Sequence, residues 1–201
     1  MPMSAGRVFV AALVSSVFMA ISAHGATVTT LCPGTAATND REFSVTTVAP
    51  GATCIASGVG NISGNPGGAN PDPLFAILGS GYQLIDKSDV SGSAMSVSGV
   101  GGLSGMWSFL LPPAPKGSMW SNLVIAFKSG VAQLNPDWAA FGLSAGVTSG
   151  TWSINNGSQS LSHVNLYGQL VPAAVPLPAA GVLMVGALGA LAASRRKRRQ
   201  A

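Results

Sequence analysis

Short apolar stretches recur along the middle of the chain, separated by Gly, Pro and Asn residues. Turn signals about ten residues apart are typical of β-sandwiches and barrels. We therefore predict an all-β, jelly-roll-like β-sandwich with long loops at 58–73 and 112–117. The predicted strands are 43–48, 53–57, 74–78, 82–86, 94–100, 106–111, 123–127, 139–143, 150–154 and 161–167.

The end of this region carries a hairpin signal. Asn156-Gly157 suits a type I′ turn between two strands. The residues after it alternate as in a strand, so that two apolar side chains lie on one face and three others on the opposite face. The first face holds Val164 and Leu166, and the second holds His163, Asn165 and Tyr167.

A different pattern begins near the C-terminal end, where residues 177–193 contain no charged side chain. As a helix this run spans about 25 Å, at the short end of what crosses a bilayer. We predict one C-terminal transmembrane helix, and a buried core helix is the alternative. The basic cluster behind it predicts a cytoplasmic end by the positive-inside rule. That cluster consists of Arg195, Arg196, Lys197, Arg198 and Arg199.

The N-terminal pattern predicts export. Arg7 precedes an apolar run at 8–21, and small residues follow it. This order is that of a secretory signal peptide at 1–25, with cleavage after Gly25; an uncleaved anchor is the alternative. The two ends divide the chain into the signal peptide, an exported domain at 26–170, a linker at 171–174 and a C-terminal segment at 175–201.

The charge of the chain lies mostly in these ends. The formal net charge is +4, but Arg7 and the terminal cluster supply six of the ten basic residues. The exported domain keeps four basic residues against six acidic ones, a net charge of −2. It has no basic patch with interleaved aromatic residues, which excludes nucleic acid as a partner.

Cys32 and Cys54 are the only cysteines. In an oxidising compartment an even count predicts a disulfide, and two free buried thiols are the alternative. Closing a loop of this length is worth about 3 kcal/mol in the chain-entropy model. A zinc site is not expected, because two cysteines lack the further ligands of a tetrahedral centre.

The C-terminal segment starts with the motif Val175, Pro176, Leu177, Pro178 and Ala179, and the apolar span and basic end follow it. With these three parts in this order, it closely resembles the VPLPA variant of the PEP-CTERM protein-sorting domain. That family occurs in Gram-negative bacteria that make extracellular polysaccharide. The resemblance implies an inner-membrane anchor that is cut near the motif by an exosortase, a membrane-embedded cysteine transpeptidase. A eukaryotic GPI signal is the nearest rival, but it ends apolar.

The exported domain shows little sign of catalysis. His163 is its only histidine, and no Gly-x-Ser-x-Gly nucleophile pattern accompanies it. Asp86 and Asp89 are candidate calcium ligands, with a solvated turn as the alternative. Trp120 and Trp138 lie nearest to loop signals and are candidate glycan contacts, although aromatic residues on strands more often belong to the core. We predict no catalytic residue, no metal and no cofactor.

Three functions follow from these observations. The first is a non-enzymatic surface or matrix protein, exported through signal peptidase and sorted by an exosortase into the envelope, the exopolysaccharide layer or the biofilm matrix. The second is a carbohydrate-binding module that uses exposed Trp and Asn side chains. The third is a hydrolase centred on His163.

Overall fold

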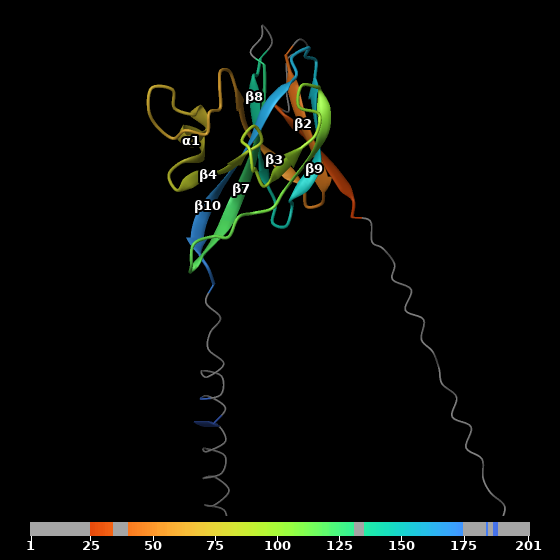
Figure 1. Ribbon diagram of the computed structural model, residues 1–201. Helices are drawn as coiled ribbons and strands as arrows, with labels where there is room; N and C mark the ends of the chain where they lie inside the picture. Colours follow the sequence, from red (N-terminus) through yellow and green to blue (C-terminus); the bar gives the residue numbers. More distant parts are fainter. Residues whose placement is uncertain (1–24, 34–39, 131–134, 175–183, 185–186, 189–201) are drawn as a thin grey trace, which may run out of the picture.

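The computed structural model describes residues 25–33, 40–130, 135–174, 184, 187 and 188. These residues form two five-stranded sheets packed face to face, with a short helix, α1 (Pro73–Leu78), beside them (Figure 1). The strands are β1 (Thr27–Cys32), β2 (Glu42–Val48), β3 (Ala52–Gly58), β4 (Tyr82–Lys87), β5 (Met95–Val97), β6 (Ser104–Phe109), β7 (Ser118–Ser129), β8 (Trp138–Leu143), β9 (Ser149–Asn155) and β10 (Leu161–Pro172).

Both sheets are antiparallel throughout. The first sheet has the strand order β1-β2-β9-β6-β5, and the second has the order β3-β8-β7-β10-β4. The prediction of an all-β sandwich is confirmed.

Aromatic side chains from both sheets fill the space between them. Trp107 and Trp152 enter from the first sheet, and Phe127 and Phe141 enter from the second. The ring centroid of Phe127 lies 6.1 Å from that of Trp152 and 6.0 Å from that of Phe141. Large aromatic rings bury the most apolar area per residue, so these side chains hold the two sheets together.

A disulfide joins the sheets at one edge. Cys32 on β1 bonds Cys54 on β3, and their Cα atoms lie 5.3 Å apart. The Thr30 hydroxyl donates to the Ala52 carbonyl across the same edge, at 2.7 Å. The predicted pairing of the two cysteines is confirmed.

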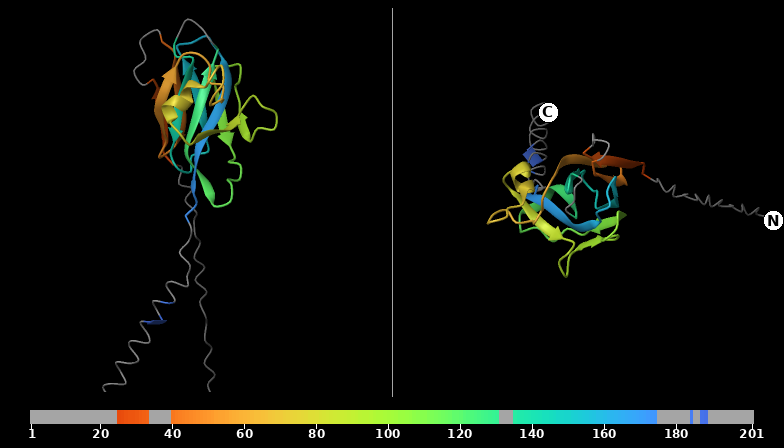
Figure 2. Two further views of the ribbon diagram at one scale, coloured as in Figure 1. Left: turned by 90° about the vertical axis from the view of Figure 1, so that its left-hand side faces the viewer. Right: turned by 90° about the horizontal axis from the view of Figure 1, so that it is seen from above.

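The segment 59–81 forms a further layer on the outer face of the second sheet (Figures 1 and 2). Ile62 and Leu74 of this segment are buried against Val124 on β7 and Tyr167 on β10. The second sheet is therefore covered on both faces, which explains why β10 is buried at both sets of alternating positions.

Helix α1 corrects one predicted strand. Residues 74–78 form part of this helix. The Asp72 carboxylate caps it by accepting from the Leu74 amide, and Pro73 occupies its first turn, where a missing amide costs nothing. Gly79 ends it at a φ of 84°. These local start and stop signals outweigh the apolar run, which is also consistent with a strand.

The predicted hairpin at Asn156-Gly157 is wrong. β9 belongs to the first sheet and β10 to the second, so the segment between them crosses from one sheet to the other. Asn156 has a positive φ of 58°, whereas Gly157 is not among the residues with positive φ. A type I′ turn needs positive φ at both positions.

One strand and one strand boundary also differ from expectation. β1 was not predicted, because its few apolar side chains form no continuous stretch. β10 runs on to Pro172, so Val171 and Pro172, expected in the linker, belong to the strand. There they pair with Met119 and Ser118 of β7.

The outer face of the first sheet carries small hydroxyl side chains. Thr29 bonds Thr46 across the strands at 2.7 Å, and Ser44 bonds Ser153 at 2.6 Å. These bonds satisfy the hydroxyl groups without any charged partner. The face also includes Ser104, Ser108, Ser149 and Thr151, around the exposed Met106.

β1 begins and β10 ends at the same end of the sandwich (Figures 1 and 2). Residues 1–24 of the expected signal peptide, the motif Val175 to Ala179, most of the run 177–193 and the basic cluster Arg195 to Arg199 lie outside the described residues. Within the described part of the chain, no helix has the length and apolar character needed to span a bilayer.

Candidate functional site

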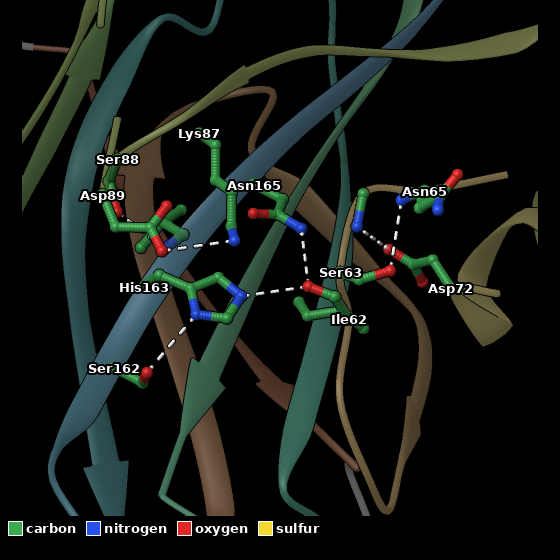
Figure 3. Close-up of polar contacts among 12 residues, drawn as sticks. Ile62, Ser63, Asn65, Asp72, Lys87, Ser88, Asp89, Ser162, His163 and Asn165 are labelled. Atoms are coloured by element: carbon green, nitrogen blue, oxygen red, sulfur yellow. Dashed lines mark hydrogen bonds and ion pairs between the residues drawn. The ribbon is translucent and has the colours of Figure 1, made fainter. Parts of the chain in front are cut away.

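Three side chains of β10 point away from the core toward the segment 59–81, and the first two of them are labelled in Figure 3. They are His163, Asn165 and Tyr167, on the face opposite to Val164 and Leu166, as the alternation predicts. All three are buried, although each carries a polar group that water would normally solvate. Buried polar groups need partners inside the protein, and here the partners come from the segment 59–81.

Tyr167 and Asp72 form the shortest of these contacts. The Tyr167 hydroxyl donates to Asp72 Oδ2 at 2.5 Å and accepts from Asn165 Nδ2 at 2.8 Å. Burial raises the pKa of Tyr167 far above its usual value, and the hydrogen bond to Asp72 raises it further. The hydroxyl therefore keeps its proton and its role as donor at neutral pH.

The Asp72 carboxylate also accepts hydrogen bonds from two backbone amides of the segment itself. Oδ1 accepts from the Leu74 amide at 2.9 Å, and Oδ2 accepts from the Gly64 amide at 2.7 Å. With the Tyr167 hydroxyl, three donors converge on this buried group. Both oxygens are thus occupied, which compensates for the loss of water around the charge.

The carbonyl of Ile62 is held by two side chains of β10. Asn165 Nδ2 donates to it at 3.0 Å, and His163 Nε2 lies 3.0 Å from it. Because a carbonyl only accepts, Nε2 carries the proton, and Nδ1 is left to accept from the Ser162 hydroxyl at 3.3 Å. Burial lowers the pKa of His163, so the ring is neutral at pH 7.

A pocket of about 320 Å³ opens on the solvent side of this anchored segment. Hydrogen bonds within the segment shape it: the Asp72 amide donates to the Asn65 carbonyl at 2.8 Å, and the Asn65 amide donates to Ser63 Oγ at 3.2 Å. Figure 3 shows Ser63 and Asn65 beside Asp72. The pocket is lined by Asn61, Ser63, Ala69, Asn70, Pro71 and Pro73.

These lining residues were not among the candidate contacts predicted from the sequence. The only signal for them is the density of Asn, Pro and Gly between positions 58 and 73, which predicts a long loop and nothing about its ligand. The segment gains its shape from bonds to β10, which is about a hundred residues further along the chain and shares no local pattern with it.

The structure corrects the expectation for Trp138. Its side chain is 2% exposed, and its indole Nε1 donates to the Val59 carbonyl at 3.2 Å. It packs beneath the start of the segment 59–81 and offers no ring face for a sugar. Trp120 is half-buried near the end of β10, and its Nε1 donates to the Pro112 carbonyl at 3.0 Å.

A second buried polar cluster joins the sheets near the ends of β2, β7 and β8. Arg41 Nη1 lies 3.8 Å from Asp137 Oδ1 and donates to the Ser129 hydroxyl. Lys128, also buried, donates to the Ser129 carbonyl. Burial lowers the pKa of both basic groups, and Asp137 opposes this shift. Asp137 therefore pairs with Arg41 and also favours the charged form of Lys128.

The candidate calcium ligands bond to protein groups instead. Asp86 Oδ2 accepts from the Ser93 hydroxyl at 2.8 Å and from the Met95 amide at 3.0 Å. Asp89 pairs with Lys87 at 3.2 Å. Across the described ranges, no three His, Cys, Asp or Glu side chains come together as metal ligands would.

A shallower pocket of about 240 Å³ lies on the hydroxyl face of the first sheet. It is lined by Ser96, Ser98, Met106, Trp107, Ser108 and Ser149. The Ser98 hydroxyl accepts from the Met106 amide at 2.8 Å, so part of its polar lining serves the sheet itself.

Comparison of the chain with protein-family models, with curated proteins and with solved structures found no match.

Proposed function

We propose that this chain is an exported, non-enzymatic protein of the surface of a Gram-negative bacterium, sorted by an exosortase through its C-terminal segment. Its partners are the export machinery, signal peptidase, the inner membrane as a transient anchor and the exosortase. Its destination is the envelope or the exopolysaccharide matrix.

The observation that carries this proposal is where the sandwich ends. β10 pairs with β7 as far as Pro172, and the motif begins three residues later at Val175. Cleavage near the motif therefore removes no strand and breaks no contact of the core. A sorting signal needs this separation, because the folded domain must stay intact when its anchor is cut.

The polar network on β10 supports a non-enzymatic role. The Tyr167 hydroxyl, both oxygens of Asp72 and Nε2 of His163 hold the segment 59–81 in place. General acid–base catalysis needs a titratable group within reach of a substrate proton. Here those groups are directed into the protein.

We also propose the finer features of the fold. The nested strand pairs β2–β9 and β3–β8 give the sandwich its jelly-roll-like character. The run 177–193 forms the single transmembrane helix, and two prolines keep the preceding motif extended so that a transpeptidase binds it as a strand-like peptide.

The motif is tested by the double variant Pro176→Ala/Pro178→Ala in cells that contain the exosortase. The matched control is Pro113→Ala/Pro115→Ala, which removes two exposed prolines at the same spacing within the exported domain. We expect the motif variant to stay in the membrane fraction with its basic end attached, and the control to be processed like the parent. Normal processing of the motif variant would overturn the proposal.

A further inference from the structure

We propose that the pocket lined by Asn61, Ser63, Ala69, Asn70, Pro71 and Pro73, here called the loop pocket, binds a neutral sugar unit of a polysaccharide. The inference deepens the proposed function by naming the partner that the sorted domain meets at the cell surface, and it rests on that function for its setting.

The polar groups of the loop pocket match sugar hydroxyls. Asn61 and Asn70 are exposed, and their carboxamides make no hydrogen bond to another residue within the described part of the chain. A carboxamide offers two donor hydrogens and an acceptor oxygen, and a hydroxyl offers both roles as well. Two free amides facing one pocket therefore suit a ligand whose hydroxyls donate and accept in turn.

The remaining lining residues provide an apolar surface. Pro71 and Pro73 present rigid rings, and Ala69 adds a methyl group. A sugar ring has hydroxyls at its edge and C–H groups on its faces, so it needs polar and apolar contacts side by side. Small-ligand sites commonly combine apolar walls with a few placed polar groups.

The loop pocket contains no charged side chain. The carboxylate of Asp72, which lies between Pro71 and Pro73 in the sequence, is buried with both oxygens occupied. An acidic sugar would meet no cation, and a metal ion would meet no free carboxylate. The volume of about 320 Å³ is at the low end of small-ligand sites, which span about 300–1,000 Å³. These features select a single neutral sugar unit over an ion or a large cofactor.

The segment that forms the pocket is already held in shape. Ile62 and Asp72 tie it to β10 through buried hydrogen bonds. Gly64 lies so close to β4 that a Cβ there would come within 2.5 Å of the Leu84 side chain, and its φ is 77°. A site held in its binding conformation loses less entropy when the ligand binds.

The test uses the full chain, purified in detergent, on immobilised dextran, galactomannan and alginate. We expect the chain to bind a neutral polysaccharide, dextran or galactomannan, in preference to the acidic alginate. The double variant Asn61→Ala/Asn70→Ala should weaken that binding about tenfold, since it removes two amide partners. The matched control Asn155→Ala removes an exposed amide from the first sheet and should bind like the parent.

Thermal unfolding of both variants shows whether they keep the parent fold. Unchanged polysaccharide binding in the folded double variant would overturn the inference. The polysaccharide would then have to bind at Trp120 or at the hydroxyl face of the first sheet. A preference for alginate, or no binding to either neutral polysaccharide, would also overturn it. Each of these results leaves the sorting proposal standing, because processing at the motif is measured separately.

Discussion

Tyr167→Phe tests whether the buried network on β10 holds the segment 59–81 in place. The substitution removes one oxygen and keeps the ring, which packs edge-on against Phe75 with centroids 5.5 Å apart. Asp72 loses its 2.5 Å hydrogen bond, and Asn165 loses its acceptor at 2.8 Å. The variant therefore changes hydrogen bonding while leaving the shape of the core almost unaltered.

The expected loss of stability follows from those two bonds. A hydrogen bond to a charged group contributes about 1.5–3 kcal/mol, and an unsatisfied buried donor costs about 1–3 kcal/mol. Asn165 keeps its bond to the Ile62 carbonyl, and Asp72 keeps two amide donors, so the losses fall at the lower end of these ranges. We expect the free energy of unfolding to fall by about 2.5 kcal/mol.

Urea unfolding followed by Trp fluorescence measures this change, because three of the four tryptophans are buried. The matched control is Tyr82→Phe, which removes the only other tyrosine hydroxyl, from a partly exposed ring on β4. Its effect should stay below about 0.5 kcal/mol. A loss for Tyr167→Phe as small as that of the control would refute the view that this network anchors the segment.

Three further predictions concern pH, the buried ion pair and the disulfide. In the unfolded chain His163 takes up a proton below about pH 6.5, whereas burial keeps it neutral in the fold. As the pH decreases below about 6.5, the free energy of unfolding should therefore decrease by up to about 1.4 kcal/mol per pH unit. The decrease should end when the pH reaches the lowered pKa of His163 in the folded protein. Urea titrations of His163→Gln should show a shallower fall, and an identical one would contradict the assignment. Asp137→Asn leaves Arg41 without its carboxylate and should cost at least about 3 kcal/mol in urea unfolding. Asp89→Asn, at an exposed pair, should cost under about 1 kcal/mol, and equal losses would argue against the buried pair. Replacing both cysteines by Ala should lower the free energy of unfolding by about 3 kcal/mol, and an unchanged urea midpoint would rule out that contribution.

The strands were predictable where turn residues separate short apolar stretches. β2 to β10 each overlap a predicted strand, since Gly, Pro and Asn mark their ends. β1 escaped detection because an edge strand needs only one hydrogen-bonded neighbour and few apolar contacts. Its Thr side chains meet those of β2, a pairing visible only once the sheet is built.

The helix could have been predicted, and the partner sheet of each strand could not. Asp72, Pro73 and Gly79 are the cap, first-turn residue and terminator of α1, and all three stand in the sequence. That β9 and β10 lie in different sheets depends on long-range packing. The dipeptide Asn156-Gly157 favours a tight turn, but it carries no information on which sheet each of the two strands joins.

The candidate site was the least predictable part of the molecule. The Asn-rich and Pro-rich composition of 58–73 predicts a loop, but its anchors lie on β10. Likewise, Arg41 and Asp137 are far apart in the chain and belong to no motif, and only the packing of the two sheets brings them together. Conversely, Trp138 looked available from its position beside a loop, but the start of the segment 59–81 covers it.

The central claim is that an exosortase removes the C-terminal segment and leaves the sandwich whole. The most direct measurement is the intact mass of the mature protein, isolated from cells with the exosortase and from cells without it. We expect a mass that corresponds to a chain starting near Ala26 and ending near the motif when the enzyme is present. Without it, the mass should include the cluster from Arg195 to Arg199. The same mass in both cells, with that cluster retained, would contradict the proposal.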